Sequence, residues 1–332
     1  MIERARRLVG AGGPRGRLPG MTVIVLLAIT VTVNALLARN FFSSYSLTSN
    51  FSSFVPIVAA SIGQTIIILA GGIDLSLGAL ITLSSVMSVV LMDGNPANLP
   101  LAVAVAVGVG AMGGLINGLI VAYLRLQAIV ATFAMSFVFA GITLKVLPRP
   151  GGEVPSVMTS TYRDAVLGVP VAALVILGLY GLWWIVKRRK VGRHLYAVGG
   201  DERAAYASGV NVNRVRVTSY VLGGTFGGLA ALAILANTGS GDPYVGAAVG
   251  TALIGGETTL ASIAAVVIGG TALRGGVGGA GGTIGGAIIL ALLSNIVFFA
   301  RIPAGFRELI DGAIIIGALA LAAVPAFQRR VA

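Results

Sequence analysis

The sequence predicts an all-α integral membrane protein with about ten transmembrane helices. Of its 332 residues, 56% are hydrophobic and 10% are charged, whereas roughly 25% are charged in soluble domains. The mean hydropathy is +0.96, and long apolar runs alternate with short polar intervals. Glycine is abundant, with 48 residues, and small residues let helices approach closely in lipid. These observations exclude a soluble globular protein.

The chain is expected to begin with a basic cytoplasmic tail over residues 1–20, followed by a membrane domain over residues 21–326. The first span is predicted at Met21–Ala38, which no small-residue cleavage site follows, so a retained helix is favoured over a signal peptide. An external polar loop is expected over Asn40–Asn50. The further spans are predicted at Phe54–Ala70, Ala79–Met92, Leu101–Val121, Ile129–Leu147, Val169–Val186, Val217–Ala236, Ile263–Leu273, Ile284–Phe299 and Ile310–Val324.

The interval Lys187–Arg216 is the long polar segment inside this apolar chain. It holds eight of the 23 lysine and arginine residues, and basic segments between spans stay in the cytoplasm. The basic residues at both ends of the chain likewise predict two cytoplasmic termini, which agrees with an even number of spans. The glycine-rich segment Asn237–Glu257 fits neither a span nor a free loop, and it is predicted to be re-entrant or interfacial.

A short helix is predicted over Asp201–Ser208, in the middle of this interval. Acidic residues occupy its first turn, alanines favour helix, and Gly209 can end it in a left-handed conformation. A turn is expected at Gly199 and Gly200. An exposed short helix of this kind suits docking to a partner, and a solvated connecting loop is the alternative. The candidate docking residues are Gly199, Gly200, Asp201, Glu202, Ala204, Ala205, Ser208 and Gly209.

Asp74 is the most informative single residue, since it lies in the segment GGIDLSLG (Gly71–Gly78) between two apolar runs. A carboxylate at bilayer depth costs roughly 2.5–3.5 kcal/mol. Asp74 can cap the following helix by accepting from the backbone N–H groups of Leu75–Leu77, and Ser76 adds a second polar group. The other interpretation is that this break lines a water-filled pathway.

Several neutral polar side chains also lie within the predicted spans. They can hydrogen-bond a hydroxylated solute, or they can bridge helices at about 0.6 kcal/mol each. Together with Asp74 and Ser76 they form the candidate substrate pathway: Gln64, Asn117, Gln127, Thr132 and Asn295.

Enzyme signatures are missing from the sequence, so no catalytic residue and no metal site are predicted. The chain has no cysteine and one histidine, His194, and it has no phosphate-binding loop of the type G-x-x-x-x-G-K-[ST]. Its net charge of +12 is explained by membrane topology, and no nucleic-acid partner is expected. Membrane lipid surrounds such a chain. A transporter without its own energy source needs a partner that supplies it.

Four stretches resemble the permease subunits of bacterial sugar ABC importers, in the ribose, xylose, arabinose and galactose branch. They are AGGIDLSLGALITLSS (Ala70–Ser85), NGLIVAYLRLQAIVAT (Asn117–Thr132), GRHLYAVGGDERAAYASGVNVNRVR (Gly192–Arg216) and AAVVIGGTALRGGVG (Ala264–Gly278). The resemblance implies the ten-helix type II importer fold in the inner membrane. It also implies a second permease copy or paralogue, ABC ATPase subunits that hold ATP and Mg, and a periplasmic sugar-binding protein. The segment Gly199–Gly209 matches the part that contacts the ATPase.

The chain departs from the family pattern at two places. Relatives commonly have ELDAIAAVV where this chain has TLASIAAVV, with Thr259 and Ala261 at the two acidic positions. They often have LNNG where this chain has Leu293–Ile296. These differences point away from a typical ribose permease and are compatible with one half of a heterodimer.

The sequence therefore predicts a permease subunit of an ATP-driven importer of a sugar or similar polyhydroxylated solute. A stand-alone secondary transporter or channel for a small polar solute is the alternative. Transport that persists without an ATPase would favour that alternative.

Overall fold

The computed structural model describes residues 17–244 and 256–301, with a few separate residues between 306 and 317. Over these residues the regular secondary structure is helical, apart from one short antiparallel strand pair and one isolated β-bridge between Gly151 and Gly241. In chain order the elements are α2 (Arg17–Leu37), α3 (Ser44–Leu69), α4 (Leu77–Met92), η1 (Pro96–Asn98), α5 (Leu99–Tyr123), α6 (Ala128–Val146), α7 (Ser156–Tyr162), β1 (Ala165–Val166), β2 (Val169–Pro170), α8 (Val171–Arg188), α9 (Lys190–Gly200), α10 (Glu202–Ala207), α11 (Val212–Thr238), α12 (Gly256–Ile268) and α13 (Ala280–Phe299).

The described helices confirm an all-α membrane protein with several spans. Six of them are long and apolar enough to cross a membrane: α3, α5 with η1, α6, α8, α11 and α13. Three further helices are apolar but shorter: α4, α12 and residues Met21–Leu37 of α2. Residues 1–16 of the predicted tail and most of the predicted span Ile310–Val324 lie outside the described residues.

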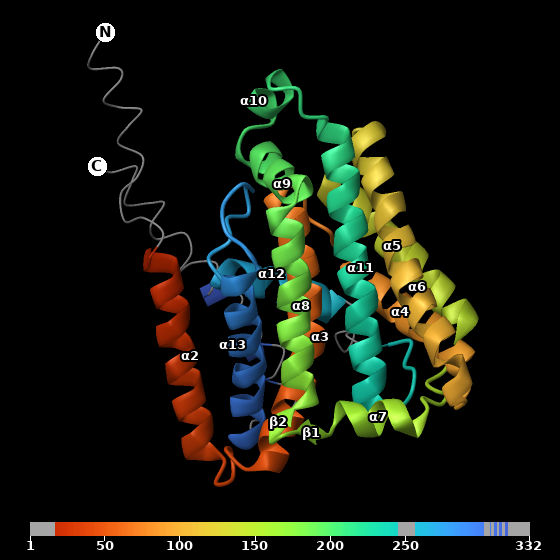
Figure 1. The fold of residues 1–332 in the computed structure, drawn as a ribbon, viewed down its shortest axis with the longest axis vertical. Coiled ribbons are helices and arrows are strands. Elements are labelled where there is room, and N and C mark those ends of the chain that lie inside the picture. The colour runs from red at the N-terminus through yellow and green to blue at the C-terminus, as the bar shows by residue number, and fades with distance from the viewer. Residues whose placement is uncertain are drawn as a thin grey trace.

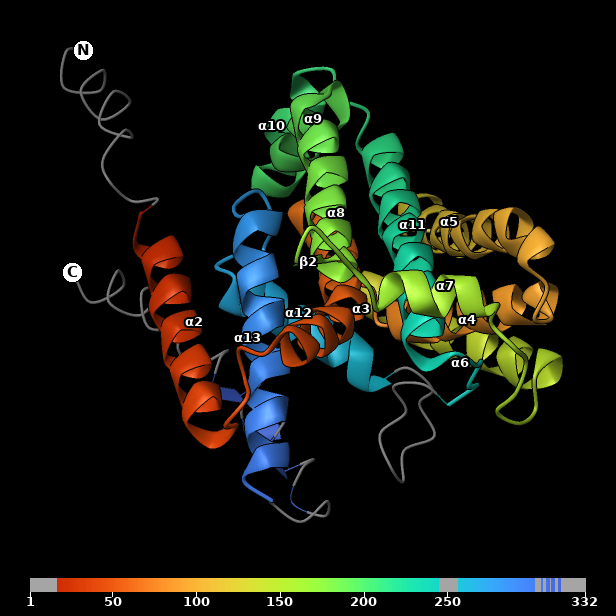
Figure 2. The same ribbon diagram turned by 60° about the horizontal axis from the view of Figure 1, so that its bottom comes forward.

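Helices α3 and α11 form the centre of the bundle. Their most apolar stretches are 83% and 72% buried, whereas no more than 33% is buried in the other four long helices, which leaves apolar faces for lipid. Helix α3 packs against α8, α11, α12 and α13, and α11 packs mainly against α3, α4 and α5. Helix α2 stands at one edge beside α13 (Figures 1 and 2).

The contact between α11 and α5 is built from glycines. A Cβ on Gly110 would lie 2.9 Å from the Gly228 nitrogen, and a Cβ on Gly114 would lie 2.8 Å from the Tyr220 carbonyl carbon. Because only glycine permits such an approach, the two backbones touch directly. The four-residue spacing of small residues in α5 therefore serves helix packing.

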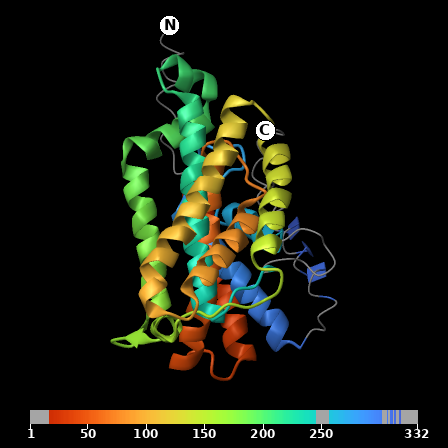
Figure 3. The ribbon, with the colours of Figure 1, turned by 90° about the vertical axis from the view of Figure 1, so that its right-hand side faces the viewer.

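The two ends of the bundle differ in structure. Helices α9 and α10 lie at one end, called here the basic end because it carries residues 187–216, whereas α7 and the β1–β2 pair lie at the other (Figure 1). Figure 3 shows the same separation from the side. The strand pair joins Ala165 to Pro170 and Val166 to Val169.

The external loop expected over Asn40–Asn50 is wrong for most of its length, because α3 already begins at Ser44. Ser43 explains the early start, since its side chain accepts a hydrogen bond of 3.2 Å from the Ser46 N–H and so caps the helix. The polar residues that suggested a loop are accommodated in the first turns of a helix.

The span expected over Ile263–Leu273 is also wrong at its end, because α12 stops at Ile268. Gly269 packs directly on the backbone of Thr283, and Gly270 has a φ of +79°, a conformation that glycine adopts without strain. Of the segment Asn237–Glu257, the first residues complete α11 and the last begin α12. Residues 245–255, where a re-entrant or interfacial structure was predicted, lie outside the described residues.

Candidate functional site

Asp74 lies in a non-helical break between two consecutive helices of the bundle. Helix α3 ends at Leu69 and α4 begins at Leu77, and Gly71 in the break has a φ of +83°. The Asp74 side chain is fully buried. The segment that interrupts the apolar runs is therefore an interruption of the helix, as predicted.

The Asp74 carboxylate is held by three hydrogen bonds from neutral donors. One oxygen accepts from the Ser76 N–H (2.8 Å) and from the Ser76 hydroxyl (2.7 Å). The Asn117 amide of α5 donates to the other oxygen (3.2 Å) and to the Ser76 hydroxyl oxygen (2.7 Å). The predicted hydrogen bond from a backbone N–H within Leu75–Leu77 is confirmed for Ser76. Because this N–H precedes the first residue of α4, Asp74 fixes the turn that leads into the helix and does not cap the first turn of the helix itself.

Three further helices brace the same break. The Thr132 hydroxyl of α6 accepts from the Leu75 N–H (2.9 Å), and the Tyr220 hydroxyl of α11 donates to the Ile73 carbonyl (3.1 Å). At the start of α4, the Gly78 N–H donates to the Thr259 hydroxyl of α12 (2.8 Å). We call Asp74, Ser76, Asn117 and Thr132 the Asp74 cluster, and it joins the break before α4 to α5 and α6.

The remaining predicted pathway residues form no hydrogen bond with the Asp74 cluster in the described part of the chain. Asn295 of α13 donates to the Asn50 side chain of α3 (3.0 Å), which is a bridge between helices. Gln127 is exposed at the start of α6. Gln64 is fully buried in α3, and neither polar atom of its side chain has a hydrogen-bond partner among the described residues.

The basic interval contains more helix than the sequence predicted. Helix α9 covers Lys190–Gly200, so the turn expected at Gly199 and Gly200 is wrong. A Cβ on Gly199 would lie 2.6 Å from the Gly276 nitrogen and 2.9 Å from the Leu69 carbonyl carbon. Gly199 is therefore required by packing between segments distant in sequence, which local turn rules cannot reveal.

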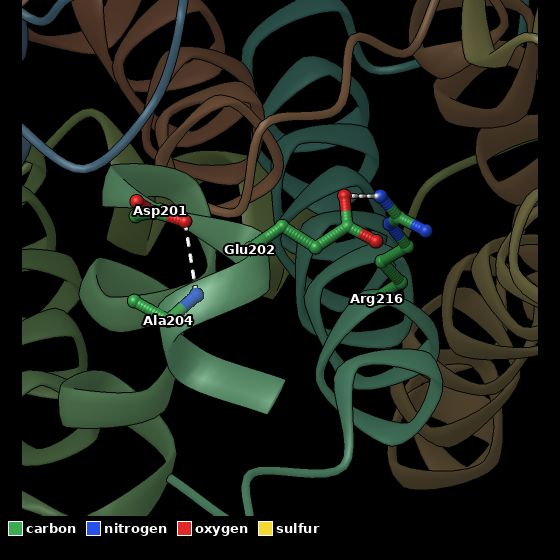
Figure 4. Close-up of polar contacts among 4 residues, drawn as sticks. All are labelled: Asp201, Glu202, Ala204 and Arg216. Carbon is green, nitrogen blue, oxygen red and sulfur yellow. Dashed lines mark hydrogen bonds and ion pairs between the residues drawn. The ribbon is translucent and has the colours of Figure 1, made fainter. Parts of the chain in front are cut away.

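The predicted short helix is confirmed as α10. The Asp201 carboxylate accepts a hydrogen bond of 3.0 Å from the Ala204 N–H and caps the helix (Figure 4). The Glu202 carboxylate forms an ion pair of 2.5 Å with the Arg216 guanidinium of α11 (Figure 4). A carboxylate in the first turn is also favoured by the helix dipole.

The other end of α10 is closed by a Schellman motif. The Gly209 N–H donates to the Tyr206 carbonyl (2.9 Å), and the Val210 N–H donates to the Ala205 carbonyl (3.0 Å). Gly209 has a φ of +81°, as this motif demands of its glycine. The predicted left-handed end is thus confirmed. Both ends of a helix of six residues are fixed, which gives it a defined shape.

The side chains of α10 divide into an inner and an outer set. Ala205 is 5% exposed and belongs to the main hydrophobic core, so it anchors the helix. Arg203, Ala204 and Ala207 are exposed, as is Tyr206 at 75%. A partner that docks on this helix would contact this outer set and not Ala205.

An open groove of about 1700 Å³ lies beside α10 at the basic end. The turn between α5 and α6, with Arg125 and Gln127, forms part of its wall, and the start of α11 forms another. The groove reaches Gly71 and Gly72 of the break and Tyr220 of α11. The residues that line the groove do not include the Asp74 cluster, so the groove runs from the surface near α10 to the first residues of the break.

The sequence comparisons identify the class of protein that carries this arrangement. Over residues 46–319, the chain matches the family described as the permease component of the branched-chain amino acid transport system. The chain belongs to this permease family. The sequence resemblance to ABC importer permeases is therefore confirmed, and the chain is a membrane permease component.

Curated relatives align with this permease over most of their length. It is 32% identical over 302 residues to the ribose import permease protein RbsC of Escherichia coli (strain K12), covering 88% of this chain and 90% of the relative. It is 33% identical over 285 residues to the fructose import permease protein FrcC of Rhizobium meliloti, covering 82% and 76%. The D-allose transport system permease protein AlsC of Escherichia coli (strain K12) is 29% identical over 308 residues, with 90% of each chain covered. No solved structure matches the chain.

The sequence pattern does not reveal Tyr220 and Thr259 as supports of the break. Each is one of several hydroxyl-bearing side chains in its mainly apolar helix, as is the predicted Thr132. The pattern alone gives no ranking among such residues, because their contacts join helices far apart in the sequence.

Proposed function

We propose that this permease is the transmembrane subunit of an ATP-driven importer of a sugar or a similar polyhydroxylated solute in the bacterial inner membrane. The observation that carries the proposal is the alignment over 88% of this chain with a relative named as a ribose import permease. The fructose and allose permeases support the same class of solute. A periplasmic binding protein delivers the solute, and a second permease copy or a paralogue completes the pathway.

A separate ABC ATPase supplies the energy, with ATP and Mg bound on that partner. It docks at the basic end on the outer side chains of α10. The support for this role is the rigidity of α10, which is capped by Asp201 and closed at Gly209, together with its exposed outer set. The basic residues of 187–216 support a cytoplasmic position for this end, and the basic residues at both ends of the chain support cytoplasmic termini.

The Asp74 cluster and the buried amide of Gln64 belong to the moving part of the solute pathway. Gln64 supports this role because a buried amide without partners is costly, at roughly 1–3 kcal/mol, unless another state of the protein satisfies it. A conformation in which the break before α4 shifts would expose these polar groups to a hydroxylated solute.

The test is co-purification with an ABC ATPase and a sugar-binding protein from the same organism. The tagged permease in detergent should retain the ATPase, and sugar-loaded binding protein should stimulate ATP hydrolysis. A permease that retains no ATPase while it still transports solute would contradict the proposal and favour a stand-alone transporter.

A further inference from the structure

Three backbone segments meet at the point where α3 ends. The Leu69 carbonyl at the end of α3 accepts a hydrogen bond of 3.1 Å from the Gly276 N–H. Gly199, at the end of α9, packs against the same carbonyl group and against Gly276. We call Leu69, Gly199, Gly275 and Gly276 the glycine joint.

The glycine joint leaves no room for side chains between these backbones. A Cβ on Gly275 would lie 3.0 Å from the Gly199 Cα, from the Gly71 nitrogen and from the Ile68 carbonyl oxygen. A Cβ on Gly276 would lie 2.5 Å from the Gly200 Cα. Close-packed groups of this kind are barely compressible and transmit displacement. No flexible side chain separates these backbones. A shift of α9 along α3 would therefore displace the C-terminal end of α3.

The joint has the docking helix on one side and the break on the other. Along the chain, Gly200 and the capping residue Asp201 follow Gly199 directly, and α10 begins next. In the other direction, Leu69 is followed by Gly71 and by Asp74, whose carboxylate is held by Asn117 of α5. The path from α10 to the Asp74 cluster therefore runs through contacts between backbone atoms.

A second contact attaches α9 to the same loop. The Tyr196 hydroxyl donates a hydrogen bond of 2.7 Å to the Gly278 carbonyl. Burial raises the pKa of Tyr196, so the phenol keeps its proton at neutral pH and remains a donor. The loop Gly275–Gly278 is thus held to α9 at Tyr196 and at Gly199, which lie one turn apart along the helix.

We propose that Gly199 is a positioning residue of the transport cycle. Its contact with Leu69 and Gly276 carries the movement of α10, when the ATPase changes state, to the break that holds Asp74. This inference rests on the proposed function, because it assumes that an ATPase docks on α10. It adds the residue through which the docking helix acts on the membrane part.

The neighbouring glycines offer a matched pair of variants. Gly199→Ala places a Cβ inside the joint, whereas a Cβ on Gly200 meets nothing within 4 Å. Both residues lie at the end of α9 without a positive φ, so the effect of alanine on helix propensity is shared. The measurements are the ATPase retained by tagged permease, the hydrolysis stimulated by loaded binding protein, and the solute taken up per ATP.

We expect Gly199→Ala to retain the ATPase and to lose stimulated hydrolysis and uptake per ATP by roughly fivefold or more, the size of a typical coupling free energy. Gly200→Ala should keep more of both than Gly199→Ala, because its Cβ meets nothing within 4 Å. If Gly199→Ala fails to reach the membrane, Tyr196→Phe decides, since it removes one hydroxyl from the same linkage and should lower uptake per ATP while the ATPase stays bound.

Equal stimulation and uptake per ATP in Gly199→Ala and Gly200→Ala would overturn the inference alone. If the Gly199→Ala permease does not insert into the membrane, unchanged uptake per ATP in Tyr196→Phe would overturn the inference. A wild-type permease that retains no ATPase would overturn the proposed function as well, so the two failures are distinguishable.

Discussion

Glu202 in α10 and Arg216 in α11 form an ion pair of 2.5 Å across 14 positions of the chain. The ion pair attaches the first turn of α10 to the long central helix α11. Asp201 caps the same end of α10. Because both partners are partly exposed, at 51% and 31%, the pair orients α10 more than it stabilises the fold.

Arg216→Ala should weaken ATPase binding slightly, since exposed ion pairs contribute only about 0.2–1 kcal/mol. We expect a modest rise in the Kd of the purified permease for the ATPase, larger at low salt because added salt screens the pair. Arg214→Ala is the matched control, since no ion pair forms at Arg214 in the described part of the chain. Equal affinities for the two variants at low salt would contradict the orienting role.

Two neighbouring alanines of α10 should respond differently to bulk. Ala204 is exposed and Ala205 is buried in the core. Ala204→Trp should leave the thermal unfolding of the permease unchanged and weaken retention of the ATPase. Ala205→Trp should lower the unfolding temperature, because overpacking costs about 1–3 kcal/mol. Both properties are measured on permease purified in detergent, and full ATPase retention by Ala204→Trp would place the docking surface elsewhere.

The segment from Gly199 to Gly209 could be predicted from the sequence only in part. Glycine and acidic residues at the ends of Asp201–Ser208 predicted α10 correctly, because helix caps depend on local chemistry. The same local rules gave a turn at Gly199 that does not exist. That residue is glycine because Leu69, more than a hundred positions away, approaches its Cα, and one sequence carries no signal for such a contact.

The membrane part shows the same division. Apolar runs located most of the helices, and the isolated Asp74 marked the break between α3 and α4. The sequence pattern does not show which amide contacts Asp74. The Asn117 amide donates a hydrogen bond to Asp74, whereas the Asn295 amide of α13 donates to Asn50 of α3. Equivalent amides in apolar helices differ in role only through the packing of those helices.

Asp74→Leu should destabilise the permease strongly and impair uptake. It removes the acceptor of the Ser76 N–H, of the Ser76 hydroxyl and of one of the two hydrogen bonds that the Asn117 amide donates, at roughly 1–3 kcal/mol for each buried donor that stays unsatisfied. Asp74→Asn should be milder, because it keeps one acceptor oxygen. Thermal unfolding in detergent and uptake at equal membrane level test this, and wild-type behaviour of the leucine variant would show that the cluster is incidental.

Gln64→Leu should separate a role in transport from a role in the fold. Since the Gln64 amide has no partner among the described residues, its removal should leave the unfolding temperature unchanged or raise it, while solute uptake falls. Asn117→Leu is the matched change at an amide that does bridge helices, and it should lower the unfolding temperature. A strongly destabilised Gln64→Leu variant with normal uptake would assign Gln64 to the fold.

The central claim is that a separate ATPase drives this permease through α10, and uptake into proteoliposomes tests it most directly. Labelled sugar uptake is measured with binding protein outside, with the ATPase present or omitted, and with ATP or a non-hydrolysable analogue inside. The account predicts uptake only with both the ATPase and hydrolysable ATP, and its loss in Ala204→Trp. Equal uptake by the permease without the ATPase would contradict it and establish a stand-alone transporter or channel.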